Sequence, residues 1–168
     1  MELLISDTCI LIDLHNGELL EKIHELPYSL GIPDAIIYGT FDDEPELNRI
    51  NAEQIIDAGF QVFSLDSDGL LEVFEIYNKY TKPSLTDIFG LVVAKRNNAI
   101  LLTGDGSLRK SAAKENVEVK GTLWIMDEMI KHDILDKEYA AKSLNKILVE
   151  GAYLPKSECQ KRLKQWKS

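Results

Sequence analysis

The chain of 168 residues has few cysteines and no long apolar run. Its two cysteines, Cys9 and Cys159, are far apart and lack a metal-type spacing, which predicts free thiols in a reducing cytosol. No apolar run approaches the ~20 residues that span a membrane, and the N-terminus begins with a strand-like run instead of a signal peptide. These absences predict a cytoplasmic protein with no membrane partner.

Basic residues are scarce in the first half of the chain. Residues 1–78 contain 2 basic and 17 acidic side chains, whereas residues 79–168 contain 17 basic and 11 acidic side chains. The net charge of −9 argues against nucleic-acid binding, but its uneven distribution leaves two interpretations open. The basic side chains form either solvated helix faces or a phosphate-facing rim around an acidic centre.

Short apolar runs alternate with helical patterns along the whole chain, whose length suits one domain. The runs predict strands at residues 2–6, 30–33, 61–64, 99–102 and 117–119. Helices are expected at 9–14, 19–26, from 34 to the stop at Pro45, and at 47–56, 70–77, 84–92, 106–113, 122–130, 139–148 and 155–167. This alternation predicts an α/β three-layer sandwich, with a central parallel sheet of 4–5 strands flanked by helices.

Three aspartates occupy special places in this pattern. Asp7 and Asp105 each follow a predicted strand, and Asp87 lies in the first turn of a predicted helix. Each has a plain structural explanation, because Asp7 can cap a helix, Ser84 and Asp87 can form a capping box, and Asp105-Gly106 can form a turn.

Taken together, the three aspartates predict a metal site. Parallel strands end at one edge of the sheet, so Asp7 and Asp105 should approach each other there. Carboxylates that gather repel one another unless a cation lies between them, and hard oxygen ligands suit Mg²⁺ or Mn²⁺. The three histidines lie in helical segments without ligand spacing, which predicts surface or packing residues.

The chain resembles the PIN domain family. The resemblance rests on Leu4-Ile5-Ser6-Asp7-Thr8, Thr86-Asp87, Leu102-Thr103-Gly104-Asp105 and Gly121-Thr122-Leu123-Trp124-Ile125, and on a tail from Gly151 to Trp166 that is similar to that of a prokaryotic PIN subgroup. It implies a PIN-like domain at 1–150 with a C-terminal helical extension at 151–168 packed on it. It also implies a metal-dependent ribonuclease, in many prokaryotic members a VapC-type toxin held inactive by an antitoxin, and a homodimer.

By this resemblance, Asp7, Asp87 and Asp105 would bind one or two Mg²⁺ or Mn²⁺ ions. Three hydroxyl groups would support them or the substrate, and two cations would neutralise flanking phosphates of the RNA; these are Thr8, Thr103, Ser107, Arg109 and Lys110. Two metal ions ~3.5–4 Å apart would stabilise both the attacking and the leaving oxygen.

One position departs from the family pattern. Where the family usually has a glutamate, about six residues after an Ile-Pro pair, this chain has Gly39. Acids follow at Asp42, Asp43 and Glu44, and Asp43 lies one helical turn beyond Gly39 on the same face. Asp43 either completes the catalytic set or belongs to a solvated turn before Pro45.

Two alternatives to the nuclease remain open. The first is a catalytically degenerate PIN fold that binds RNA or a protein partner, which Gly39 favours. The second is a phosphohydrolase of the haloacid dehalogenase type, because Asp7 follows the first strand. That family requires a second aspartate two residues later, where this chain has Cys9.

Overall fold

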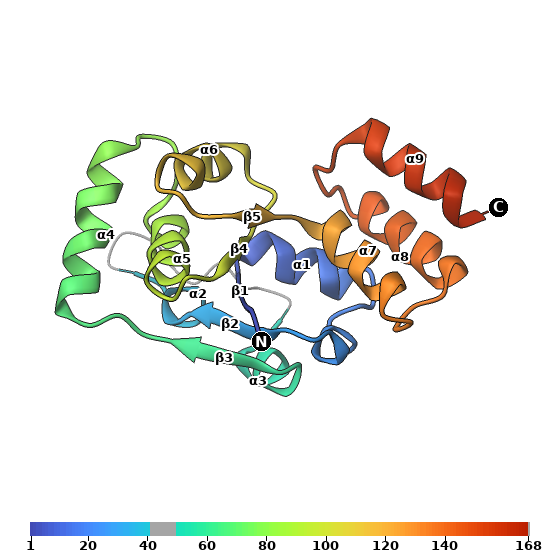
Figure 1. Ribbon diagram of the computed structural model, residues 1–168, viewed down its shortest axis with the longest axis horizontal. Helices are drawn as coiled ribbons and strands as arrows, with labels where there is room; N and C mark the ends of the chain where they lie inside the picture. The colour runs from blue at the N-terminus through green and yellow to red at the C-terminus, as the bar shows by residue number, and fades with distance from the viewer. Residues whose placement is uncertain (41–49, 168) are drawn as a thin grey trace.

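A five-stranded, all-parallel sheet forms the centre of the computed structural model, which describes residues 1–40 and 50–167 (Figure 1). Within these residues the sheet order is β3-β2-β1-β4-β5. The strands are β1 (Leu3–Ser6), β2 (Ser29–Pro33), β3 (Phe60–Phe63), β4 (Ile100–Leu102) and β5 (Val119–Lys120). All five predicted strands are present within one or two residues, which confirms the α/β class with a parallel sheet.

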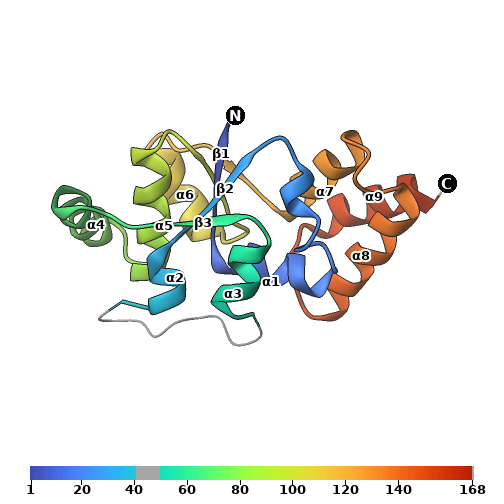
Figure 2. The same ribbon diagram turned by 90° about the horizontal axis from the view of Figure 1, so that it is seen from below.

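Helices cover both faces of the sheet, which gives the predicted three layers (Figures 1 and 2). One side carries α4 (Ser67–Lys79), α5 (Leu85–Arg96) and α6 (Gly106–Lys114). The other side carries α1 (Thr8–Asn16), α7 (Thr122–Lys131), α8 (Lys137–Val149) and α9 (Lys156–Lys167). Two short helices, α2 (Asp34–Tyr38) and α3 (Ala52–Asp57), lie next to β2 and β3 in the chain.

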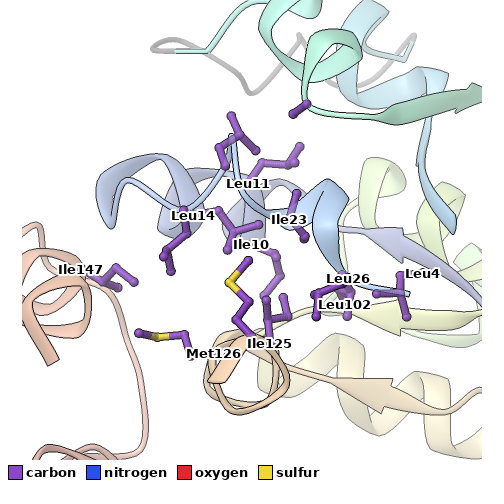
Figure 3. Close-up of a cluster of buried hydrophobic side chains, with 14 of the residues drawn as sticks. Leu4, Ile10, Leu11, Leu14, Ile23, Leu26, Leu102, Ile125, Met126 and Ile147 are labelled. Carbon is purple, nitrogen blue, oxygen red and sulfur yellow. The ribbon is translucent and has the colours of Figure 1, made fainter. Parts of the chain in front are cut away.

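Neighbouring residues of β1 point into two separate cores, as alternate residues of a strand should. Leu4 packs with Ile10 of α1 and Ile125 of α7 in the cluster that Figure 3 shows. Ile5 packs with Ile88 of α5 and Leu101 of β4 on the opposite face. Burial of each such Leu or Ile side chain stabilises the folded state by about 1.5–3 kcal/mol. The central strand is therefore anchored from both sides, which fixes the position of Asp7 at its end.

The segment 19–26 is not the helix that its apolar spacing predicts. Only a 3-10 turn forms, at Ile23–Glu25. Glu18 has a φ of 58° and Pro27 follows the segment, so the chain turns at both ends. Its four apolar side chains are nonetheless buried in the core; they are Leu19, Leu20, Ile23 and Leu26.

The helix predicted from residue 34 is present as α2, but it ends at Tyr38 and so is shorter than the stop at Pro45 suggests. Gly39 caps it with a φ of 74° and a ψ of −173°, a conformation that only glycine adopts readily. Asp42, Asp43 and Glu44 lie outside the described residues.

The apolar side chains of α1 pack inside the chain's own core and are not a surface for the homodimer that the resemblance implies. Ile10, Leu11 and Leu14 of α1 are fully buried within the chain itself. The homodimer stays a prediction without an assigned surface.

The C-terminal segment packs on the same core. Cys159 and Trp166 of α9 are buried in the cluster around α1, α7 and α8. Arg162 of α9 also donates to both carboxylate oxygens of Asp127 on α7, with Nε–Oδ1 and Nη2–Oδ2 distances of 3.0 and 2.8 Å. Among the described helices, none is long and apolar enough to cross a membrane.

Candidate active site

The strand order places the candidate site between β1 and β4. The chain leaves β1 toward β2 on one side and returns through α5 to β4 on the other side. In open parallel sheets, ligands bind beyond the carboxyl ends of the strands at such a switch point. Asp7 directly follows β1, and its backbone N donates to Leu102 O at 2.8 Å. Asp105 follows β4 by three residues, so both aspartates belong to this crevice.

Asp7 is held by hydrogen bonds on both carboxylate oxygens. Oδ1 accepts from Thr8 N at 2.9 Å, which caps α1. Oδ2 accepts from Thr103 Oγ1 at 2.7 Å and from Cys9 Sγ at 3.5 Å. Burial raises the pKa of Asp7, the three hydrogen bonds lower it, and the charge of Asp105 raises it further; the net shift is upward. A nearby cation would offset this penalty on the ionised form.

Asp105 caps α6 and is the more exposed of the two strand-end aspartates. Its Oδ1 accepts from Ser107 N at 2.8 Å, from Ser107 Oγ at 2.7 Å and from Leu108 N at 3.2 Å. Partial burial raises the pKa of Asp105, but these hydrogen bonds outweigh it and lower the pKa below its ordinary value. Within the described part of the chain, Asp105 Oδ2 accepts no hydrogen bond, so an ionised oxygen remains available.

Asp87 forms the capping box that the sequence indicates. Its backbone N donates to Ser84 Oγ at 3.1 Å, and its Oδ2 accepts from Ser84 N at 3.0 Å. The first turn of α5 therefore fixes the carboxylate in place. The positive end of the helix dipole favours its charged form there.

The three aspartates line one hollow of about 550 Å³, so the capping roles and the shared pocket coexist. We call this hollow the acidic pocket. Its rim includes Lys82 and Tyr153, and Cys9 lies in its wall. Burial of Cys9 and the neighbouring charge of Asp7 raise the pKa of its thiol to about 12, so the group stays protonated at neutral pH.

The acidic pocket contains a fourth aspartate that the sequence reasoning missed. Asp13 of α1 lines the pocket and accepts from Thr122 Oγ1, on α7, at 2.8 Å. Burial raises its pKa, and the hydrogen bond from Thr122 opposes this shift only in part. Asp13 lies four residues after Cys9, and therefore on the same face of α1. This four-residue spacing was the sequence signal that could have placed Asp13 in the pocket.

Like the buried carboxylate of Asp7, the side chain of Thr8 indicates that the pocket takes a ligand. Its Oγ1 is buried and has no hydrogen-bond partner among the described residues. Leaving a buried hydroxyl unpaired costs about 1–3 kcal/mol. Because Thr8 lines the acidic pocket, a bound water molecule or ion there would satisfy this oxygen.

The donor set fits a hydrated cation better than a fully enclosed one. In the described residues, no three His, Cys, Asp or Glu side chains form a group that would hold a metal ion by themselves. The predicted direct ligation by Asp7, Asp87 and Asp105 together therefore stays a prediction. Mg²⁺ commonly takes one or two carboxylates and keeps several waters, an arrangement that the carboxylate oxygens of this pocket allow.

The predicted hydroxyl and basic residues divide into two groups. Thr103 and Ser107 hydrogen bond to Asp7 and Asp105, respectively, and their supporting role stays a prediction. Lys110 lines a neighbouring hollow, whereas Arg109 is exposed and lines neither. The contacts of Arg109 and Lys110 with RNA stay predictions.

Comparison with known proteins agrees with this geometry. A family model described as a PIN domain matches residues 3–168, which is nearly the whole chain. A comparison with curated proteins found no match. PIN domains are usually nucleases, and they generally use divalent metal ions. With its parallel sheet and its aspartates at the carboxyl ends of β1 and β4, this chain belongs to the PIN domain family.

Proposed function

We propose that the protein is an endoribonuclease that hydrolyses RNA phosphodiester bonds with Mg²⁺ or Mn²⁺. One observation carries the proposal: Thr103 Oγ1 bridges Asp7 and Asp105 at the switch point of the sheet. Asp87 and Thr8 line the same pocket, and the buried Thr8 hydroxyl has no hydrogen-bond partner among the described residues. This arrangement supports a site where several carboxylates and a cation act together.

Each aspartate has a distinct part in this proposal. A divalent ion in the pocket would polarise the scissile phosphate and lower the pKa of an attacking water. Asp105 offers an ionised Oδ2, which accepts no hydrogen bond in the described chain, and Asp7 is oriented by Thr103. Asp87 adds negative charge from the first turn of α5. We propose that Asp7, Asp87 and Asp105 together hold the ion.

The chain's own nucleophiles are not needed for this chemistry. Cys9 is the thiol in the pocket wall, and its pKa of about 12 leaves little thiolate at neutral pH. It donates to Asp7 Oδ2, so its role is to orient the carboxylate. A water molecule is the attacking group that this environment supports.

Tyr153 is the residue we assign to a base of the RNA. It lies between α8 and α9 on the rim of the acidic pocket, and it is 99% exposed. An exposed ring stacks on any unpaired base without reading its identity. Placed beside the aspartates, it would hold a nucleotide next to the bond that is cut.

The direct test is cleavage of single-stranded RNA by purified protein with Mn²⁺ or Mg²⁺. Asp7→Asn and Asp105→Asn should each abolish cleavage, whereas Asp136→Asn should not. Asp136 is a matched control, because it also caps a helix, through Tyr139 N, and does not line the acidic pocket. Equal cleavage by all four proteins would indicate a contaminating nuclease and refute the proposal.

A degenerate PIN fold that binds RNA or protein is the second candidate. Two observations favour it: Gly39 replaces the glutamate usual in the family, and the described residues contain no ready three-ligand cluster. The two candidates differ in metal uptake. A Mn²⁺ titration that shows binding in wild type and none in Asp105→Asn favours the nuclease.

The role of a toxin in a toxin–antitoxin pair is a further part of the proposal. It predicts that expression of the wild-type chain arrests growth, that Asp105→Asn does not, and that a co-expressed antitoxin relieves the arrest. If the wild-type chain cuts RNA in vitro but does not affect growth, the nuclease proposal stands and the toxin proposal is wrong.

A further inference from the structure

A second hollow, rich in lysine, lies beside the acidic pocket. Its volume is about 490 Å³, and four lysines line it, together with Tyr80 and the first turn of α6. The lysines are Lys79, Lys82, Lys110 and Lys114. Among the described residues that line it, none is an aspartate or glutamate. We call this hollow the lysine groove. It is unusual in a chain whose net charge is −9.

Contacts across the lysine groove tie its two walls together. One wall is the segment that joins α4 to α5, and the other is α6. Glu115, which follows α6, accepts from Tyr80 Oη at 2.6 Å and from Lys79 Nζ at 3.5 Å. Lys114 Nζ lies 5.8 Å from the centre of the Tyr80 ring, a cation–π contact. The groove is therefore built into the fold.

The charges of the lysine groove are mostly uncompensated. Glu115 neutralises Lys79 and also pairs with Lys95, at 3.1 Å. Within the described part of the chain, Lys82, Lys110 and Lys114 form no ion pair with a carboxylate. Unpaired ammonium groups in one groove attract a polyanion and release its counterions. Three such groups give this groove the positive charge that binding of phosphates requires.

Lys82 connects the lysine groove to the acidic pocket, because it lines both hollows. Ser107 makes a second connection, since it lines the groove and hydrogen bonds to Asp105. A strand whose scissile phosphate lies at the aspartates would thus continue into the groove without leaving the surface.

We propose that the lysine groove holds the backbone phosphates of the RNA strand on one side of the bond that is cut. The inference rests on the proposed nuclease function. The groove carries the strand away from the acidic pocket on that side. Substrates lengthened toward the groove gain affinity, and substrates lengthened in the other direction gain less. Because phosphates are the groups bound, the effect is independent of base sequence.

The test measures binding of a labelled single-stranded RNA without divalent metal, so that cleavage does not enter the readout. Lys82→Glu and Lys110→Glu should each weaken binding several-fold on every RNA sequence. Each should also lower the slope of log affinity against log salt by about 0.7, the value for one phosphate contact on a single strand. Lys110→Gln should give the same change in slope with a smaller loss of affinity.

Lys164→Glu is the matched control. Lys164 is an exposed lysine of α9, which lies toward the opposite end of the molecule from α4 (Figures 1 and 2). Its reversal changes the net charge equally and should leave the slope within error of wild type. Thermal unfolding checks that each variant is folded.

The possible outcomes distinguish a failure of the groove proposal from a failure of the nuclease proposal. If Lys82→Glu and Lys110→Glu bind RNA like wild type and like Lys164→Glu, the groove proposal is wrong, even while wild type still cleaves with Mn²⁺. If wild type cleaves no RNA but the groove variants still lose affinity, the nuclease is wrong and the groove stands as a binding surface. An acidic protein that binds the groove while RNA does not would also overturn the proposal.

Discussion

Thr103 Oγ1 donates a hydrogen bond of 2.7 Å to Asp7 Oδ2, although the two residues are 96 positions apart. The same oxygen accepts from Asp105 N at 3.1 Å. One hydroxyl at the end of β4 therefore orients the aspartate after β1 and the turn that carries the next one. The contact links the Asp7 carboxylate to the backbone of Asp105, whose own carboxylate is held by Ser107 and Leu108.

Removing the Thr103 hydroxyl should impair the site more than the fold. Thr103→Val keeps the shape of the side chain but leaves Asp7 Oδ2 without its closest donor. Losing a group that orients a metal ligand typically lowers metal affinity or activity by about 10–100-fold. Mn²⁺ titration and RNA cleavage should both show this loss, and Thr103→Ser should restore most of it. Thr103→Val with wild-type Mn²⁺ affinity would contradict this orienting role.

Asp13 should make stability depend on pH in a defined direction. Its folded-state pKa lies above the ordinary 3.8, so its contribution to stability is present below pH 3.8 and is lost as pH rises through the folded-state pKa. Asp13→Asn removes this titration and keeps an acceptor for Thr122. In metal-free buffer, the melting temperature of the variant should rise relative to that of wild type as the pH increases from 4 to 7.

Asp13→Ala is the control for the hydrogen bond itself. It leaves the buried hydroxyl of Thr122 without an acceptor, which costs about 1–3 kcal/mol at every pH. If the advantage of Asp13→Asn over wild type shrinks as pH rises from 4 to 7, the pKa of Asp13 is lowered by folding and not raised.

Restoring the family's usual acid at Gly39 should fail. The backbone there has a φ of 74° and a ψ of −173°, and a non-glycine residue in such a conformation costs about 1–3 kcal/mol. Gly39→Glu should therefore unfold at lower temperature and gain no cleavage activity. Tyr38→Glu, at the exposed last residue of α2, should change stability by less than about 0.5 kcal/mol. Higher cleavage activity of Gly39→Glu than of wild type would contradict this prediction, because it would show that the backbone at position 39 accepts the glutamate.

Tyr153 gives a prediction about the substrate. Removing a ring that stacks on a base costs about 1–3 kcal/mol, or roughly fivefold or more in affinity. Tyr153→Ala should weaken RNA binding by that factor, and Tyr153→Phe should bind like wild type. An RNA with one abasic nucleotide at the contacted position should bind wild type and Tyr153→Ala equally. If Ala and Phe variants bind intact RNA alike, the ring has no such role.

The strands and the two strand-end aspartates were predictable from the sequence for the same reason. Parallel strands buried on both faces leave continuous apolar runs, as in Leu3–Ser6 and Ile100–Leu102. The residue after such a run must lie at the carboxyl edge of the sheet. Asp7 and Asp105 could therefore be placed together without knowing which strands are neighbours.

Other features depend on packing that sequence periodicity does not encode. Residues 19–26 bury four apolar side chains at helical spacing without forming a helix, because burial alone sets that spacing. Asp13 enters the pocket because of the direction in which α1 leaves β1. Lys82 and Lys110 share a groove where Glu115, just after α6, contacts Lys79 and Tyr80 of the segment before α5. Each of these contacts joins segments that are distant or irregular in the sequence.

The central claim is that a divalent cation binds among Asp7, Asp87 and Asp105. Anomalous diffraction from crystals soaked in Mn²⁺ tests it most directly, with Asp105→Asn crystals as the comparison. We expect a manganese peak in the acidic pocket of wild type, held by Asp7 and Asp105 directly or through water, and a weaker or absent peak in the variant. A wild-type pocket without manganese, at a Mn²⁺ concentration that supports RNA cleavage, would contradict the claim.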